Sequence, residues 1–594
     1  MSKQPKPPSP ALMKAIQEIH SLYERNQLEE SWKRVERALA KNPRSGSLHA
    51  LAAMILIKGP NQERARYHAD KSVALDPINP DVLSTRASFH MVDDEHDKAR
   101  ALYERALKSS PDHPGALAGL GTALSQLGNY SEARHAMSRL HKLNQKLAEP
   151  LVNLALLELE TTHASRAIEL LKAAPSPLDQ HPNVRNLHAL AHSYDDDVTP
   201  EQAFDAHKRF GDEIAKHIPP QTNHPNDPDP DRPLRIGYIS PDLRQHSIAY
   251  FLEPILANHD KANYQAHCFM TSSSEDAFTD RFKHHAHTWH NLFGLQIPDM
   301  AQAVRDANID ILIDLNGHFS GHKLPVFAMR PAPVQITFIG YANTTGMRTI
   351  DARIVDNTTD PAPSANAFAT EQLVRIDPCF LCYRPHENTP EPREPDPALP
   401  VTIGSFNNLM KLSTPTIRVW SEILKARPAV RLLLKASKLA SEELKAELLQ
   451  RFADQGIDQS RLDLRAFSPT TQDHLNTYNE IDLALDTFPY TGTTTTCESL
   501  VMGVPVLSLL GNSHAGRVSA SLLSAIDRKD LIARSEAEYI SKALEIIDSG
   551  KRNKSQRESL RQQVLSSPLC DQATYTRKVE DAYRTLWTQW CNPT

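Results

Sequence analysis

Cysteine is scarce in this chain, with six residues in 594, which argues against a framework of disulfides. Cys379 and Cys382 form a C-x-x-C pair, but no second Cys pair or Cys/His pair stands nearby to complete a zinc site. We therefore expect a strand with two buried thiols at this point, and neither a metal centre nor a redox centre.

Long apolar runs are also missing, since no stretch approaches the roughly 20 residues that cross a bilayer. The first ten residues are rich in proline and lack the apolar core of a signal peptide. Neither sign of charge dominates, because 66 basic residues face 72 acidic ones. These absences predict a cytoplasmic protein with no membrane partner and no nucleic-acid partner.

The first third of the chain contains an internal repeat. Two sets of residues recur every 34 positions, namely Ala65, Ala99, Ala133 and Ala167, and Pro43, Pro77 and Pro111. Small residues suit the close approach of two antiparallel helices, and the prolines fall between units. The pattern resembles the tetratricopeptide repeat, whose helix pairs stack into a solenoid with a concave groove for peptides or proteins. We assign residues 11–216 to this solenoid.

Two stretches rich in proline and acidic residues, 217–233 and 386–399, are expected to be linkers. They delimit an N-terminal lobe, 234–385, and a C-terminal lobe, 400–594, in which apolar strands alternate with amphipathic helices. The expected strands are 234–240, 309–315, 401–406, 430–435, 462–467, 482–486 and 506–510. This alternation predicts two parallel-sheet α/β domains that face each other across a cleft.

The most informative segment runs from Asp486 to Pro505, where a buried strand leads into a threonine-rich turn and then a helix. Thr493, Thr494 and Thr495 would stand at the helix N-terminus, where free amides and the helix dipole attract phosphate. Glu498, one turn further, could accept hydrogen bonds from a ribose. The segment indicates a nucleotide-diphosphate pocket, although any α/β domain can hold a threonine-capped helix.

Other polar residues follow predicted strands, and the ends of parallel strands form the ligand edge of such sheets. Lys411 could neutralise a departing diphosphate without a metal, and His246 could act as a general base. Taken singly, each has an ordinary alternative, a lysine whose stem covers apolar surface and a surface histidine.

These blocks together resemble the O-linked N-acetylglucosamine transferase and SPINDLY family of protein glycosyltransferases. The matching blocks are 235–246, 314–318, 327–335, 406–411 and 486–500, with 566–569 and 575–587 near the C-terminus. The resemblance implies a two-lobed glycosyltransferase fold of the B type. It also implies inverting, metal-independent transfer of a sugar from a nucleotide diphosphate to Ser or Thr of proteins held by the repeats.

The same resemblance gives roles to single residues. It makes His246 the active-site histidine, whose role as base is disputed, and Lys411 the lysine on the leaving diphosphate. Candidates for donor binding are Asn408, His474, Thr493, Thr494, Thr495 and Glu498. Candidates for an acceptor or phosphate loop are Asp242, His318, Gly340, Tyr341, Thr344 and Arg517. No metal and no cofactor are expected besides the donor substrate.

Three departures bear on the donor. Thr493, Glu498 and Asn408 stand where the animal enzymes have His, Asp and Gln, and the first two bring the chain closer to SPINDLY, whose plant members use GDP-fucose. The long insert between the lobes of animal enzymes is absent, which indicates a compact, bacterial-type member. Our first hypothesis is a protein transferase that uses UDP-N-acetylglucosamine. The alternatives are a GDP-fucose enzyme, a non-catalytic binding module, and a transferase for small molecules.

Overall fold

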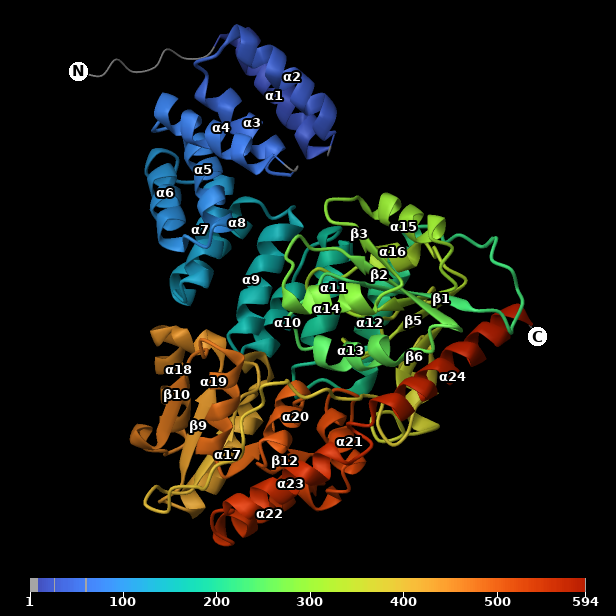
Figure 1. The fold of residues 1–594 in the computed structure, drawn as a ribbon. Coiled ribbons are helices and arrows are strands. Elements are labelled where there is room, and N and C mark those ends of the chain that lie inside the picture. The colour runs from blue at the N-terminus through green and yellow to red at the C-terminus, as the bar shows by residue number, and fades with distance from the viewer. Residues whose placement is uncertain (1–8, 26, 59–60, 593–594) are drawn as a thin grey trace. The chain divides into compact units, whose positions relative to one another are not determined.

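The computed structural model describes residues 9–25, 27–58 and 61–592, so residues 1–8, which include most of the segment compared with a signal peptide, lie outside it. Contacts divide the chain into two units, one reaching to Leu157 and the other starting at Glu158. The order of elements is helical repeats, then two parallel-sheet α/β lobes (Figure 1), which confirms the predicted fold class. In the described residues, no helix is long and apolar enough to cross a membrane.

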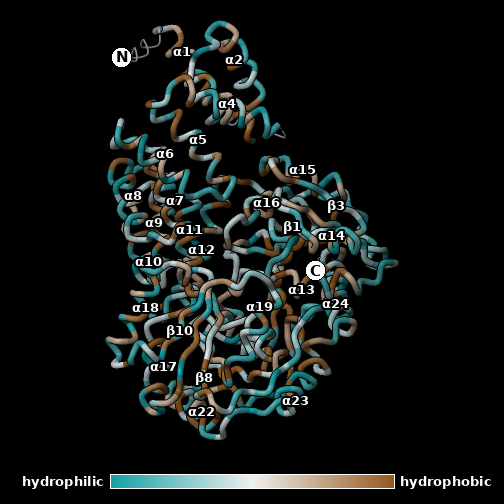
Figure 2. The backbone as a smooth tube through the Cα atoms, turned by 60° about the vertical axis from the view of Figure 1, so that its left-hand side comes forward, coloured by the Kyte–Doolittle hydropathy of each residue, from teal (hydrophilic) through white to brown (hydrophobic). Residues whose placement is uncertain are grey.

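The first unit consists of paired helices. Their bounds are α1 Pro10–Glu24, α2 Leu28–Lys41, α3 Gly46–Leu56, α4 Gln62–Leu75, α5 Pro80–Val92, α6 His96–Ser109, α7 Pro114–Gln126, α8 Tyr130–Leu143 and α9 Ala148–Glu160, the last of which crosses the boundary. The tube in Figure 2 changes between teal and brown within single helices such as α6 and α8, as amphipathic helices require.

The repeated residues do what their spacing predicts. Ala65, Ala99 and Ala133 have no exposed surface and lie at the contact between paired helices. Gly121 shows why small residues are needed, because a Cβ there would lie 2.8 Å from Cγ of Met137 on the facing helix. The periodic prolines fall in the turns between helix pairs; Pro77, for example, follows the end of α4. The repeat prediction is thereby confirmed.

Three α-helices of the second unit precede the lobes: α10 Ala164–Lys172, α11 Pro182–Ala191 and α12 Pro200–His217. The last of them is built into the N-terminal lobe, since Phe210 and Ile214 belong to the core that contains Ile239 and Phe269. A Cβ on Gly211 would lie 1.9 Å from the carbonyl oxygen of Gly346, so the helix and this loop meet backbone to backbone. The lobe therefore needs α12 for its own packing.

The N-terminal lobe is a parallel sheet of seven strands in the order β3-β2-β1-β4-β5-β6-β7. Its strands are β1 Leu234–Ser240, β2 Tyr264–Met270, β3 Thr288–Asn291, β4 Ile311–Asp314, β5 Val334–Thr337, β6 Ala352–Val355 and β7 Gln372–Arg375. Its helices are α13 Ala249–Asn258, α14 Ala277–His285, α15 Ile297–Asp306 and α16 Leu324–Ala328, with the short helix η2 Ser364–Phe368.

The C-terminal lobe is a parallel sheet of six strands in the order β10-β9-β8-β11-β12-β13. Its strands are β8 Thr402–Ser405, β9 Arg431–Lys435, β10 Leu462–Arg465, β11 Leu483–Leu485, β12 Val506–Leu509 and β13 Ile532–Ala533. Its helices are η3 Leu409–Lys411, α17 Thr414–Ala426, α18 Glu442–Asp454, α19 Thr471–Asn476, α20 Thr494–Val501, α21 Val518–Ala525, α22 Glu536–Asp548, α23 Lys554–Leu565 and α24 Gln572–Cys591.

The last helix, α24, returns to the N-terminal lobe. Glu580 accepts a hydrogen bond from the backbone N–H of Asp260 and lies 2.8 Å from the ring of His259, while the Trp587 indole donates to the backbone of Asp229. Of the two predicted linkers, 386–399 contains no helix or strand, and 217–233 contains none apart from His217, which is the last residue of α12.

The segment around Cys379 and Cys382 differs from expectation. Both thiols are buried, as predicted, but the segment is irregular and is not a strand. The backbone N–H of Phe380 donates to the side chain of Asp356 instead of entering a sheet ladder. Among the described residues, no group of three or more His, Cys, Asp or Glu is placed to hold a metal.

Candidate functional site

A buried carboxylate shapes the threonine-rich turn that follows β11. Asp486 accepts hydrogen bonds from the backbone N–H of Gly492 at 2.6 Å, from the Ser508 hydroxyl at 2.8 Å and from the Asn407 amide at 3.0 Å. Burial raises its pKa, although hydrogen bonds from Ser519, Gly492 and Ser508 and the charge of Lys411 oppose the shift. Asp486 thus ties the ends of three strands to the turn and fixes where the next helix begins.

That helix is α20, which begins at Thr494 with Thr493 as its N-cap residue. Its first backbone N–H groups point toward the carboxyl edge of the sheet, where the helix dipole is positive. The Thr495 hydroxyl donates to the Asn407 side chain, which in turn is held by Asp486. The three threonines predicted to bind phosphate therefore stand at a helix N-terminus that Asn407 and Asp486 hold in place.

Lys411 lies beside this turn, at the end of the short helix η3. Its ammonium donates to the carbonyl oxygen of Thr491 at 2.8 Å and lies 4.2 Å from the centre of the Tyr490 ring. The Tyr490 ring is itself stacked on the Tyr194 ring, with 4.8 Å between the ring centres. Burial lowers the pKa of Lys411 to about 8, opposed by the charge of Asp486. Asn408 is exposed at the start of η3, where its side chain accepts from the backbone of Met410.

A second group of polar side chains surrounds Glu498, one turn into α20. Its carboxylate lies 3.0 Å from Nε2 of His474 and accepts from the Tyr478 hydroxyl at 3.1 Å. The other ring nitrogen of His474 is 2.6 Å from the ammonium of Lys435, whose pKa burial lowers to about 8. Lys435 and Tyr478 were not among the predicted site residues. Lys435 had a usable signal, since it is the last residue of a predicted strand.

The N-terminal lobe contributes the loop after β1. His246 is 41% exposed, and Nδ1 of its ring lies 4.0 Å from Oδ2 of Asp242. The protein around the ring still desolvates it enough to lower its pKa, against the opposing charge of Asp242. Asn316, which follows β4, donates to the same Asp242 oxygen at 2.8 Å and so orients the carboxylate toward the histidine.

Contacts between the lobes bring the two groups together. The Gln245 amide, next to His246, donates to the Thr471 hydroxyl at 3.1 Å, and Thr471 begins the helix that carries His474. Tyr250, on the helix that follows His246, has its pKa raised to about 12, by burial and then by the charge of Glu498. The His246 loop therefore faces the helix pair that holds Glu498 and His474.

Of the residues predicted for an acceptor or phosphate loop, His318, Tyr341 and Thr344 are buried and Gly340 is partly buried. His318 lies 2.8 Å from Oδ1 of Asn186 and 2.9 Å from the backbone oxygen of Thr345. Tyr341 lies 2.6 Å from the His207 ring, and the Thr344 hydroxyl donates to Glu371.

The fourth, Gly340, has a backbone role. A Cβ on Gly340 would meet the Leu315 carbonyl at 1.8 Å. The contacts of all four hold the loops in place. Arg517, the remaining residue of that set, lines a separate cavity.

Comparison with known proteins gives a consistent picture. Residues 176–386 and 393–579 match the model of "Glycosyl transferase family 41", and residues 14–151 match a model of N-terminal tetratricopeptide repeats. The chain is 40% identical over 412 residues to a probable UDP-N-acetylglucosamine–peptide N-acetylglucosaminyltransferase SPINDLY of Solanum lycopersicum. That match covers 68% of this chain and 44% of the relative, so the chain spans less than half the length of such relatives.

The chain is also similar to a more distant relative and to a solved structure. Identity is 27% over 439 residues to a probable transferase of the same type from Arabidopsis thaliana, named SEC. Among solved structures, a mutant of the Thermobaculum terrenum O-GlcNAc transferase superposes with a TM-score of 0.79 at 34% identity, covering 86% of this chain and 98% of the other.

Proposed function

Since the chain belongs to glycosyl transferase family 41, we propose that it transfers a sugar from a nucleotide diphosphate to Ser or Thr hydroxyls of proteins held by its repeats. One observation carries the proposal: the Lys411 ammonium lies against the turn that leads into the N-terminus of α20, and that helix carries Glu498 one turn further in. Amides, hydroxyls and one ammonium group supply the positive end for a diphosphate without a divalent ion.

In the proposed reaction the acceptor oxygen attacks the anomeric carbon from the face opposite the diphosphate. The bond between that carbon and the phosphate oxygen breaks, and the configuration inverts. Lys411 and the first amides of α20 take up the negative charge of the leaving diphosphate. The hydroxyl proton leaves to a base on the His246 side of the cleft, where Asp242, held by Asn316, lies 4.0 Å from the imidazole.

The first candidate donor is UDP-N-acetylglucosamine, the donor in the names of the SPINDLY relatives. GDP-fucose is the second, and Thr493 and Glu498 favour it because both depart from the animal enzymes toward SPINDLY. Incubation of the purified protein with UDP-sugars and GDP-sugars, followed by intact mass spectrometry of an added protein acceptor, separates the two. Binding without turnover would favour a non-catalytic module. The proposal would be refuted if the protein neither bound nor hydrolysed any of the donors.

The pH dependence of kcat/KM should report Lys411 and His246. A lysine is charged below its pKa, so the rate should hold up to about pH 8 and fall above it as the ammonium loses its proton. A base must be unprotonated, and burial places the pKa of His246 below 6.5, so the acid limb should lie below pH 6.5. Initial rates at saturating acceptor across this range test both limbs.

Lys411→Arg is the matched variant for this profile. A guanidinium remains charged throughout the range, so any residual activity of the variant should lack the alkaline limb. An unchanged alkaline limb in Lys411→Arg would assign that limb to another group.

Glu498→Ala should raise the KM for the donor by about 10- to 100-fold with a smaller effect on kcat, because a charge-assisted hydrogen bond to a ribose is worth roughly 1.5–3 kcal/mol. Steady-state kinetics with varied donor provide the measurement. Glu545→Ala is the control, since Glu545 is an exposed glutamate of the same lobe, on α22. An unaltered donor KM in Glu498→Ala would remove Glu498 from the binding site.

A further inference from the structure

A second polar cavity lies between the lobes. It has a volume of about 220 Å³ and is lined by residues of the N-terminal lobe, by the loop 512–517 of the C-terminal lobe and by the start of α12. Of the residues assigned above to the donor or to catalysis, Lys411, Thr493 to Thr495, Glu498 and His246 do not line it. The cavity is therefore distinct from the site that the proposed function uses.

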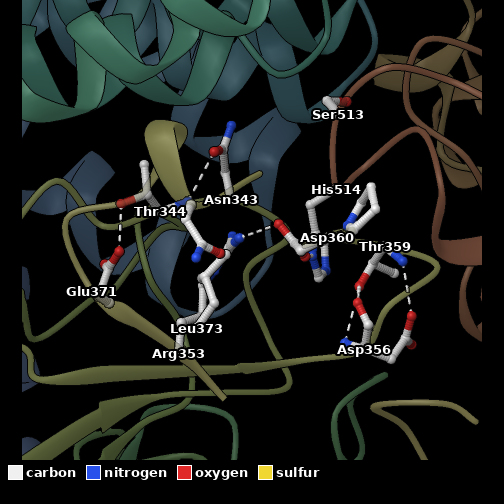
Figure 3. Close-up of polar contacts among 12 residues, drawn as sticks. Asn343, Thr344, Arg353, Asp356, Thr359, Asp360, Glu371, Leu373, Ser513 and His514 are labelled. Carbon is white, nitrogen blue, oxygen red and sulfur yellow. Dashed lines mark hydrogen bonds and ion pairs between the residues drawn. The ribbon is translucent and has the colours of Figure 1, made fainter. Parts of the chain in front are cut away.

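Arg353, on β6, lines this cavity and is only 4% exposed. One of its terminal nitrogens, Nη2, donates to Oδ1 of Asp360 at 2.6 Å (Figure 3). Its Nε and Nη1 have no hydrogen-bond partner among the described residues. Leaving such donors unpaired in a buried place is costly, so an acceptor that reached these nitrogens from the cavity would bind favourably.

His514 repeats the pattern from the other lobe. Its ring is 7% exposed, Nδ1 is bonded to Oδ2 of Asp360, and Nε2 has no partner within the described chain. Asp360 thus joins an arginine of one lobe to a histidine of the other. Burial would raise the pKa of Asp360, but the charges of Arg353 and His514 outweigh burial and hold it well below its ordinary value.

Positive charge exceeds negative charge in this cavity. Asp360 is its one acidic residue, whereas Arg353 and Arg517 both line it. Arg517 uses Nε to donate to the Gly511 carbonyl at 2.8 Å.

The nearby carboxylates are engaged elsewhere, because Glu371 accepts from Thr344 and Thr345, and Asp356 accepts from Phe380 and Ser521. The positive end of the α12 dipole lies at the same place, since Pro200 is the first residue of that helix.

We propose that this cavity binds a phosphoryl group, as free phosphate or as a phosphate monoester, between Arg353, His514 and Arg517. A planar guanidinium donates two parallel hydrogen bonds to phosphate oxygens, and the two arginines come from different lobes. The volume is several times the roughly 30 Å³ that one water occupies in the liquid, which leaves room for an attached organic group.

A phosphoryl group bound in this cavity would connect the two lobes at a point that hydrogen bonds link to Lys411. The carbonyl of Ala515, in the cavity loop, accepts from both the backbone N–H and the hydroxyl of Thr491. The Thr491 carbonyl in turn accepts from Lys411. The binding proposal stands independently of sugar transfer, because its test measures ligand binding alone.

The experiment is calorimetric titration of the full chain, saturated with UDP or GDP to block the donor site, with inorganic phosphate in one arm and phosphoserine in the other. Wild type should bind at least one of them, and its melting temperature should rise with that ligand. The ligand with the lower Kd shows whether the cavity prefers free phosphate or a phosphate monoester.

Three variants decide the location. Arg517→Gln leaves the buried Arg353–Asp360 pair intact and should raise Kd at least tenfold. The double variant Arg353→Gln with Asp360→Asn removes both buried charges together, which guards against unfolding by an unpaired carboxylate, and should abolish binding. Lys411→Met should bind as wild type does. Loss of binding in Lys411→Met with retention in the other two, or no binding of either ligand by wild type, would overturn the proposal.

Discussion

Replacement of Lys411 by Met should lower kcat by about 10²- to 10³-fold or more, with little change in the KM for the protein acceptor. The expected size is that of removing one preorganised electrostatic group from a water-poor site. Lys411 is held by the Thr491 carbonyl and the face of Tyr490, so the ammonium is already positioned before a diphosphate arrives. Single-turnover transfer from a labelled donor measures the effect on the chemical step.

Two comparisons make this result specific. Lys425→Met removes an exposed lysine of α17 that pairs with Glu422 on the surface, and it should leave the rate unchanged because such pairs contribute little. Circular dichroism of Lys411→Met should match wild type. Wild-type turnover in Lys411→Met would exclude its role on the leaving group.

Removal of residues 1–144 should reduce transfer to protein acceptors by about 10²-fold or more while donor hydrolysis continues. A solenoid that holds an acceptor raises its effective concentration at the cleft, and gains of 10²–10⁴ are typical when two binding events are linked. The cut is placed at the end of α8 because the helices from α10 onward belong to the unit of the lobes. The rate with a folded protein acceptor measures transfer, and the rate with water as acceptor measures donor hydrolysis.

Removal of residues 1–216 is the variant to compare with removal of residues 1–144. It would take Phe210 and Ile214 out of the core of the N-terminal lobe, so this shorter chain should lose donor hydrolysis and thermal stability together. Full transfer to proteins by the chain that lacks residues 1–144 would favour a small-molecule transferase or an acceptor site on the lobes alone.

Much of the architecture could be predicted because it depends on local patterns. The repeat follows from alanines that recur every 34 residues, and Ala65, Ala99 and Ala133 prove fully buried. The strands follow from apolar runs, and the helix at Thr494 follows from a threonine-rich turn after a buried strand. The C-x-x-C segment was the failure, since Asp356 competes with a sheet ladder for its backbone donors.

The partners of the site residues could not be predicted in the same way. Asn316 holds Asp242 from 74 positions away, and Tyr194, in the segment predicted to belong to the repeats, stacks on Tyr490. The Arg353–Asp360–His514 group likewise joins two lobes. Such contacts depend on the tertiary arrangement, which no local pattern in a single sequence encodes.

The central claim is that the two lobes hold a nucleotide diphosphate at Lys411 and the N-terminus of α20, and a crystal structure of the complex with UDP or GDP tests it most directly. The account predicts phosphate oxygens within hydrogen-bond distance of the Lys411 ammonium and of the amides of Thr494 and Thr495, with the ribose at Glu498. A diphosphate bound elsewhere, with Lys411 and Thr494 both free of it, would contradict the account.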